Sequence, residues 1–147
     1  MISSTTDLSL ALANDLRPVV LRVARQLRKE TEQFGVTARQ ATLLILVQRS
    51  PGLTLRALAE LEDISAPALS GHIDRLEDAG LLVRVRSEVD RRRVGLDLTP
   101  AGERLILSIR ERRTAWLAER LDALEPDELR AIEAAIGPLR TLAGLDP

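Results

Sequence analysis

The spacing of apolar residues changes from a helical to a strand-like period after Gly80, and this change most restricts the folds open to the chain. Before Gly80, apolar residues recur every three or four positions, which is typical of helices packed on one side. After it, apolar residues alternate with others in "LVRVRS" (82–87) and again in "VGLDL" (94–98), which is typical of strands. The two runs predict a β-hairpin with "EVDRRR" (88–93) at its tip. The alternation also directs Arg84 and Arg86 outward.

The segments before the hairpin are predicted to be helices. Residues 7–32 carry a helical apolar stripe, and Pro18 within it should kink this helix or start its straight part. Thr37 and Gln40 form a capping-box pattern, so residues 43–47 are assigned to a buried helix rather than a strand.

Two shorter helices follow, joined by a tight turn. Thr54 can cap "LRALAELE" (55–62), and Ser65 can cap a second helix that has Pro67 in its permissive first turn. This second helix should run to about Ala79 and end at Gly80. Two short helices in this arrangement predict a helix-turn-helix.

Two further helices are predicted after the hairpin. Thr99 caps a long helix that starts after Pro100, and Pro126 opens the last one. The chain is therefore predicted to be mainly α-helical with a small antiparallel wing of two to three strands. It forms a winged helix-turn-helix over about residues 37–99, flanked by helices over about 7–32 and 100–143, in one domain of residues 1–147.

Composition excludes several functions. The chain has no cysteine, which excludes disulfides, thiolate metal sites and cysteine-based redox sensing. His72 is its only histidine, so no metal site is expected, and no cofactor or enzyme activity either, because no glycine-rich phosphate loop is present. With no apolar run of transmembrane length and no signal-peptide pattern at the N-terminus, we expect a cytoplasmic protein.

Charge is distributed unevenly although the net charge is only −1. Residues 84–93 contain five arginines and two acids, whereas residues 119–147 contain seven acids and three arginines. Clustered basic charge is a better sign of a nucleic-acid-binding face than net charge is. The hairpin tip is therefore predicted to contact a polyanion, the alternative being a solvated loop.

The segment "DRRRVGLDLTPAG" (90–102) and the helix-turn-helix segment 52–84 resemble the MarR family of transcriptional regulators, and the resemblance covers nearly the whole chain. Residues that match the family's wing pattern are Asp90, Arg92, Leu98, Thr99 and Gly102. The resemblance implies a dimeric, sequence-specific regulator that binds double-stranded DNA and acts as a repressor relieved by a small ligand. The alternative is a winged-helix adaptor that binds protein and has no reason to keep the Asp90–Arg92 wing.

The wing and the second helix of the helix-turn-helix supply the predicted DNA contacts. An arginine at a hairpin tip can enter the minor groove, and the resemblance implies that Arg92 does so while Asp90 holds its guanidinium. Arg91 and Arg93 either contact phosphate or are solvated. The full set of candidate DNA contacts is Thr54, Arg56, Ser65, Pro67, Ser70, Arg75, Arg86, Asp90, Arg91 and Arg92.

The second helix is predicted to be the recognition helix. Its stripe of Leu69, Ile73 and Leu76 should be buried, which leaves Pro67 and Ser70 as the best candidates for major-groove contacts. Ser65 should lie near phosphate. Arg75 matches a family arginine that contacts the DNA backbone, a local ion pair being the alternative.

Two positions of this helix depart from the family pattern. Gly71 stands where relatives often carry a long side chain, so it permits closer approach to DNA but removes a base-reading group. His72 stands where an apolar residue is usual. It is interpreted as a hydrogen-bonded structural histidine, the alternative being a DNA-linked or pH-linked role.

The flanking helices carry apolar stripes that a winged helix of this size cannot cover, and the resemblance implies that they interlock with a second copy. The expected dimerisation residues are Leu12, Leu16, Trp116, Leu117, Leu129, Ile132, Ile136 and Leu139, the alternative for each being the core of a single chain. A two-fold dimer predicts a pseudo-palindromic operator. A small aromatic or anionic effector would bind near Leu16, Val20, Val23 and Leu44, positions that equally fit a packed core.

Overall fold

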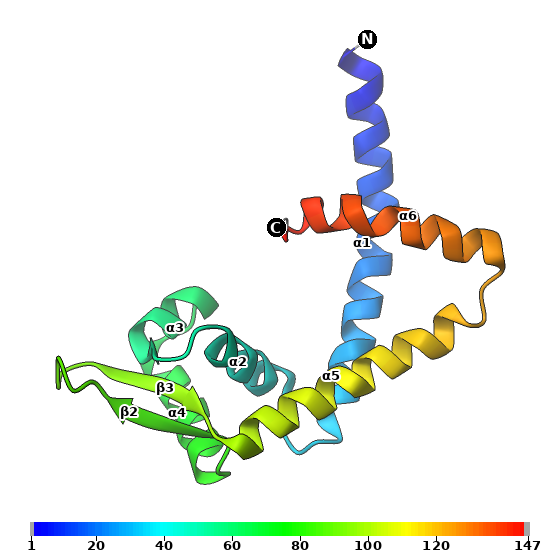
Figure 1. Cartoon of the computed structure of the whole chain (residues 1–147). Helices are drawn as coiled ribbons and strands as arrows, with labels where there is room; N and C mark the ends of the chain where they lie inside the picture. The colour runs from blue at the N-terminus through cyan, green and yellow to red at the C-terminus, as the bar shows by residue number, and fades with distance from the viewer. Residues whose placement is uncertain (1, 146–147) are drawn as a thin grey trace. The chain divides into compact units, whose positions relative to one another are not determined.

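The computed structural model describes residues 2–145, with side chains from Thr5 onward, and is mostly helical. The chain forms two compact units, one up to Arg113 and one from Thr114 on. Figure 1 shows its elements in chain order: α1 (Ile2–Glu32), α2 (Ala38–Arg49), β1 (Leu53–Thr54), α3 (Leu55–Glu62), α4 (Ala66–Asp78), β2 (Leu82–Arg86), β3 (Val94–Leu98), α5 (Pro100–Leu121) and α6 (Pro126–Leu142). The predicted fold class, a helical protein with a small antiparallel wing, is confirmed.

The local signals that predicted the helices are present in the structure. The amide of Gln40 donates to Thr37 Oγ1 (3.1 Å) and the amide of Thr37 donates to Gln40 Oε1 (3.0 Å), which completes the capping box of α2. Helix α4 ends at Asp78, and Gly80 follows with φ of +73°. Helix α1 begins at Ile2 rather than residue 7 and continues through Pro18 without a break.

The sheet has three antiparallel strands in the order β1-β3-β2. Strand β2 pairs with β3 from Leu82–Leu98 to Arg86–Val94, which is the predicted hairpin. The third strand is the two-residue β1, paired with the other edge of β3. Gly95 of β3 allows this pairing, because a Cβ there would lie 2.8 Å from the carbonyl oxygen of Gly52.

One apolar core holds the unit up to Arg113 together. The recognition-helix stripe of Leu69, Ile73 and Leu76 is buried as predicted. Other fully or almost fully buried side chains in this core are Leu43, Leu44, Val47, Leu58, Leu82, Leu96, Ile106 and Ile109. Because α2, α3, α4, α5 and two strands all contribute, the helix-turn-helix and the base of the wing rest on a shared core.

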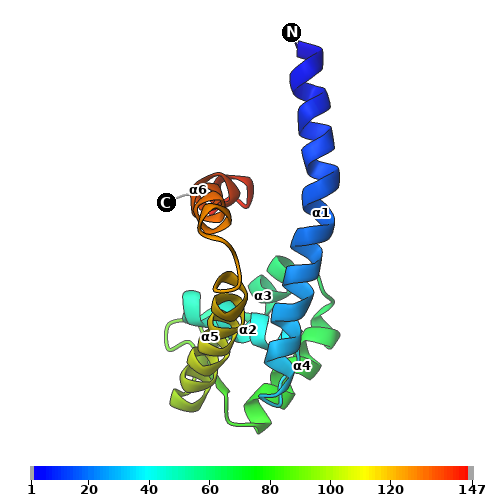
Figure 2. The same ribbon diagram turned by 90° about the vertical axis from the view of Figure 1, so that its right-hand side faces the viewer.

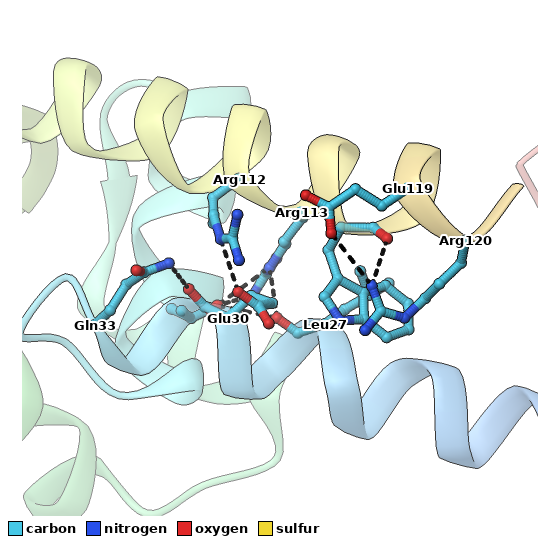
Figure 3. A network of polar contacts seen from close by, with 9 residues as sticks. Leu27, Glu30, Gln33, Arg112, Arg113, Glu119 and Arg120 are labelled. Carbon is cyan, nitrogen blue, oxygen red and sulfur yellow. Dashed lines mark hydrogen bonds and ion pairs between the residues drawn. The ribbon is translucent and has the colours of Figure 1, made fainter. Parts of the chain in front are cut away.

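Helix α1 is held at its C-terminal end by polar contacts with α5 (Figure 3). The Arg113 guanidinium donates to the carbonyl of Leu27 (3.2 Å) and to the hydroxyl of the fully buried Thr31 (2.6 Å). Arg112 pairs with Glu30 at 2.8 Å. Burial, and to a lesser extent the charge of Arg28, lowers the pKa of Arg113. The N-terminal part of α1 extends away from this unit's core (Figure 2), and its leucines are exposed.

The unit from Thr114 onward contains the end of α5 and all of α6. Helix α6 begins with a capping box in which the amide of Glu125 donates to the Glu128 carboxylate at 2.9 Å. The guanidinium of Arg120 lies 3.7 Å from the centre of the Trp116 ring and donates to the Trp116 carbonyl at 3.0 Å (Figure 3). Trp116 is 8% exposed, whereas most of α6 is exposed.

Candidate nucleic-acid interface

The turn between α3 and α4 sets the direction in which α4 leaves the core. Asp63 ends α3 in the left-handed region, with φ of 50° and ψ of 48°. The amide of Asp63 donates to the Glu60 carbonyl at 3.3 Å, and the amide of Ile64 donates to the Ala59 carbonyl at 3.2 Å. Aspartate tolerates this conformation better than most residues. The turn therefore closes within two residues, as the predicted helix-turn-helix requires.

Ser65 presents the N-terminus of α4 to solvent. Its Oγ accepts the amide proton of Ala68 at 3.3 Å, so the serine is the predicted N-cap. A hydroxyl that accepts one hydrogen bond can still donate its own proton, so Ser65 can cap the helix and bind phosphate together. Pro67 is exposed and Ser70 is half-buried. Arg75 is exposed and forms no ion pair with any residue in the range 2–145.

Arg84 differs from its predicted position. It lies on the same face of β2 as the buried Leu82, is only 27% exposed, and binds two acids of α4. Its Nη1 lies 2.6 Å from Glu77 Oε1 and its Nη2 lies 2.6 Å from Asp74 Oδ1. The prediction that Arg84 points outward is wrong, because hairpin packing places this face against α4.

The hydrogen bond to Asp74, followed by the hydrogen bond to and charge of Glu77, raises the pKa of Arg84 against the opposing effect of partial burial. A third contact binds the strand itself, since the backbone amide of Arg84 donates to Glu77 Oε2 at 3.2 Å. Sequence reasoning missed this cluster. The available signal was an acid pair three residues apart on α4, followed closely by an arginine on the next strand.

At the wing tip, Asp90 orders the backbone rather than a side chain. Its Oδ1 accepts the amide proton of Arg92 at 3.1 Å, and its carbonyl accepts the amide proton of Arg93 at 2.9 Å. Within the described residues, no ion pair joins Asp90 to the Arg92 guanidinium, so the expected contact between them is corrected to a backbone contact. Arg91, Arg92 and Arg93 are exposed, and none forms an ion pair within the described part of the chain.

A groove brings several of the predicted contacts together. It has a volume of about 470 Å³ and is lined by Thr54, Leu55 and Arg56 from the start of α3, and by Arg92, Arg93 and Val94 from the wing. Arg56 reaches Glu60 at 3.4 Å, but both side chains are largely exposed, so this pair is weak. The groove therefore brings the side chains of three arginines together. It includes Arg93, for which the sequence left open either a phosphate contact or a solvated position.

A family model described as the MarR family matches residues 34–93, the segment that carries the helix-turn-helix and the wing tip. The chain is also 34% identical over 122 residues to the HTH-type transcriptional regulator ML2140 of Mycobacterium leprae, over 83% of this chain and 85% of the relative. The chain belongs to the MarR family. It is accordingly a helix-turn-helix transcriptional regulator that binds DNA, and not an enzyme.

Solved structures agree with the fold of this MarR-family protein. The transcriptional regulator Tm0710 from Thermotoga maritima has a TM-score of 0.77 at 25% identity, over 90% of this chain and 94% of the other. The F27L mutant of Staphylococcus aureus MepR, solved bound to an oligodeoxyribonucleotide, has a TM-score of 0.70 at 20% identity, over 91% and 97% of the two chains. This second likeness is evidence of fold alone.

His72 and Gly71 are the two positions of α4 that depart from the family pattern. His72 is half-buried, and its Nδ1 is buried without a hydrogen-bond partner among the described residues, so the hydrogen bond expected of a structural histidine is not formed at this nitrogen. A Cβ added at Gly71 would meet nothing within 4 Å in the described chain. Packing within this chain therefore does not require glycine at position 71, which is consistent with the predicted close approach to DNA.

The predicted effector positions do not form one exposed surface. Leu44 is fully buried in the core of its unit, so the packed-core alternative holds for it. Leu16 and Val23 are half-buried on α1, and Val20 is 48% exposed. Within residues 2–145, no helix is long and apolar enough to cross a membrane, and no cluster of side chains suits a metal ion.

The predicted dimerisation residues differ in exposure within one chain. Leu12, Leu129, Ile132 and Ile136 are exposed, with exposed fractions from 37% to 58%. Leu16, Leu117 and Leu139 are half-buried, while Trp116 is buried. A shallow groove of about 340 Å³ in the unit from Thr114 on is lined by Leu121, Leu129, Arg130, Ile132, Glu133 and Ile136.

Proposed function

We propose that this MarR-family regulator is a homodimeric repressor that binds a pseudo-palindromic operator and is released by a small aromatic or anionic effector. The observation that carries the proposal is the paired arrangement of α4 and the wing. The exposed start of α4 can enter a major groove, and the unpaired arginines of residues 91–93 can reach the adjacent minor groove or its phosphates. The MepR structure bound to an oligodeoxyribonucleotide supports this use of the fold.

Recognition in this proposal combines the two contact types. Phosphate contacts from Arg56, Arg86, Arg91 and the Ser65 hydroxyl fix the register, and residues at the start of α4 read bases. Arg92 occupies the minor groove, held in place by the backbone contact with Asp90. Because Gly71 removes a base-reading side chain, DNA shape in the minor groove contributes strongly to specificity.

Exposed apolar residues support the homodimer. On α1, Leu8, Leu10 and Leu12 are 58% to 67% exposed, and on α6, Ile132 and Ile136 are 40% and 47% exposed. Apolar side chains repeated along helices in this way are costly in water. A second copy that interlocks with these helices would cover them and present two winged helices to one operator.

Release by an effector follows from the same arrangement. A ligand that prefers the dimer conformation with unsuitable spacing of its two recognition helices shifts the population away from DNA. Small aromatic carboxylates such as benzoate are a suitable first probe, because they match the proposed chemical class. A regulator of this kind acts where the chromosome lies, which supports a cytoplasmic location.

The test is binding of the purified protein to DNA from upstream of its own gene and to a scrambled duplex of the same length, at stated salt. We expect binding in the nanomolar range to the upstream DNA and steep weakening with salt. Arg92→Ala should weaken specific binding about tenfold or more because it removes the minor-groove contact. The control Arg140→Ala makes the same charge change on α6 and should bind like the unaltered protein.

Equal, weak binding to both duplexes by a dimeric, folded protein would contradict the proposal. It would favour the alternative in which the winged helix binds another protein. DNA from neighbouring intergenic regions should then be tested in the same way before the alternative is accepted. A benzoate titration of the preformed complex tests release, and unchanged DNA binding at saturating benzoate would count against this effector class.

A further inference from the structure

The cluster of Arg84, Asp74 and Glu77 joins the two parts of the protein that are proposed to contact DNA. Arg84 lies in β2 of the wing, and both acids lie on α4. The two guanidinium contacts are each 2.6 Å, and the backbone amide of Arg84 supplies the third contact at 3.2 Å. The carboxylate of Glu77 therefore holds both the side chain and the main chain of the same residue.

The position of the cluster on the hairpin lets it affect the position of the wing tip. Arg84 pairs with Leu96 across the hairpin, and the last paired residues before the tip are Arg86 and Val94. At a rise of about 3.3 Å per residue, Arg84 is roughly 7 Å along the strand from Arg86. Any change in the angle between β2 and α4 at Arg84 is therefore carried outward to Arg92.

The cluster also removes an electrostatic obstacle. Asp74 and Glu77 are two negative charges on a recognition helix, with exposed side-chain fractions of 59% and 37%. Carboxylates facing phosphates repel them unless a cation lies between or beside them. One guanidinium shared between the two acids halves their charge on this side of α4.

We propose that Arg84 is a positioning residue for DNA recognition: it fixes the angle between wing and recognition helix and offsets the charge of Asp74 and Glu77. The inference rests on the proposed function. Both terminal nitrogens of Arg84 are engaged with carboxylates, so its part in recognition is exerted through α4 and β2 rather than by contact with phosphate.

The test compares Arg84→Met with Arg86→Met in full-length protein, using upstream and scrambled duplexes and thermal unfolding as a check on folding. Methionine keeps the aliphatic length and removes the charge. Arg86 is exposed on the same strand and forms no ion pair within residues 2–145. Its replacement should therefore weaken binding to both duplexes about equally. Arg84→Met should instead lower the preference for upstream over scrambled DNA about tenfold.

A third variant separates the two effects of Arg84. Arg84→Met combined with Asp74→Asn and Glu77→Gln removes the negative charge of both acids but does not restore the connection between wing and helix. We expect it to regain affinity for scrambled DNA, while the preference for upstream DNA remains low. Recovery of that preference would overturn the positioning role, and a failure to regain scrambled-DNA affinity would overturn the charge effect.

The two levels of inference fail in different ways. If the unaltered protein shows no preference for upstream DNA, the proposed function fails before Arg84 is tested. If the unaltered protein is selective, and the Arg84→Met variant folds and is equally selective, then the proposed role of Arg84 is wrong. Should Arg84→Met not fold, Arg84→Lys replaces it, because lysine keeps the charge but cannot bridge both carboxylates, and it too should lose selectivity.

Discussion

Arginines on one strand differ in role because their surroundings differ. Arg84 and Arg86 lie two residues apart and so share a face of β2. Arg84 lies opposite two carboxylates of α4, whereas Arg86 is exposed with no ion pair in the described chain. A guanidinium already bound to two acids is a structural connection, and one that is free is available to phosphate.

The two glycines 71 and 102 allow a matched prediction at the level of single residues. A Cβ at Gly102 would lie 2.0 Å from the Leu81 carbonyl oxygen, where α5 packs on the turn that precedes β2, but a Cβ at Gly71 would meet no described atom within 4 Å. We expect Gly102→Ala to lower the free energy of unfolding by about 1–3 kcal/mol. Gly71→Ala should raise it by about 0.5–1 kcal/mol because alanine is the better helix former. Urea denaturation measures both.

The outcome that contradicts this prediction is equal stability of the two variants. Gly71→Ala also has a separate use in a DNA titration. If close approach of α4 to DNA requires that position 71 carry no side chain, this more stable variant should bind upstream DNA more weakly than the unaltered protein. Unchanged affinity would show that DNA leaves room beside position 71.

At the level of elements, the start of α4 has two requirements that one serine can meet. The helix needs an acceptor for the amide of Ala68, and DNA needs a donor or a neutral group near phosphate. The αL turn at Asp63 and the capping of α4 by Ser65 are adjacent, so the geometry of this junction is set within three residues.

Replacing Ser65 by alanine or aspartate separates these requirements. Ser65→Ala should lower the free energy of unfolding by about 1 kcal/mol through loss of the cap. Ser65→Asp should keep the cap and the stability, since aspartate is an equally good N-cap, yet weaken DNA binding more than alanine does by repelling phosphate. Thermal unfolding and DNA titrations check both. Tighter DNA binding by Ser65→Asp than by Ser65→Ala would contradict this prediction and show that no DNA phosphate lies near position 65.

At the level of the whole molecule, the exposed apolar faces of α1 and α6 are the features that a single chain leaves unexplained. The winged helix has its own buried core, so these faces are not needed to fold it. Their cost in water is offset only if something covers them, and the proposed second copy would do so while also matching the symmetry of the proposed operator.

Ile136→Asp tests this assembly. A charge in the proposed interface should convert a dimer of twice the 16.2 kDa monomer mass into a monomer, measured by analytical ultracentrifugation. Operator affinity should fall about a hundredfold, because one winged helix then binds one half-site. Val89→Asp, at a 99% exposed wing residue, is the control and should remain dimeric. Monomeric unaltered protein would contradict the proposed assembly.

Much of the fold could be predicted from the sequence because its signals are local. The capping box of Thr37 and Gln40, the N-cap Ser65 and the positive-φ Gly80 each act within a few residues, so the printed order of residues is sufficient to place helix ends. The change of apolar period after Gly80 likewise located the hairpin, and the stripe of α4 identified its buried face.

The tertiary structure alone decided the contacts that shape the interface. Alternation placed Arg84 and Arg86 on one face of β2 but could not show that this face meets the acids of α4. The backbone role of Asp90, the location of the third strand β1 and the lack of a partner for His72 Nδ1 among the described residues escaped prediction in the same way. Local periodicity tells which side of an element faces inward, whereas partners across elements depend on packing angles set by the whole core.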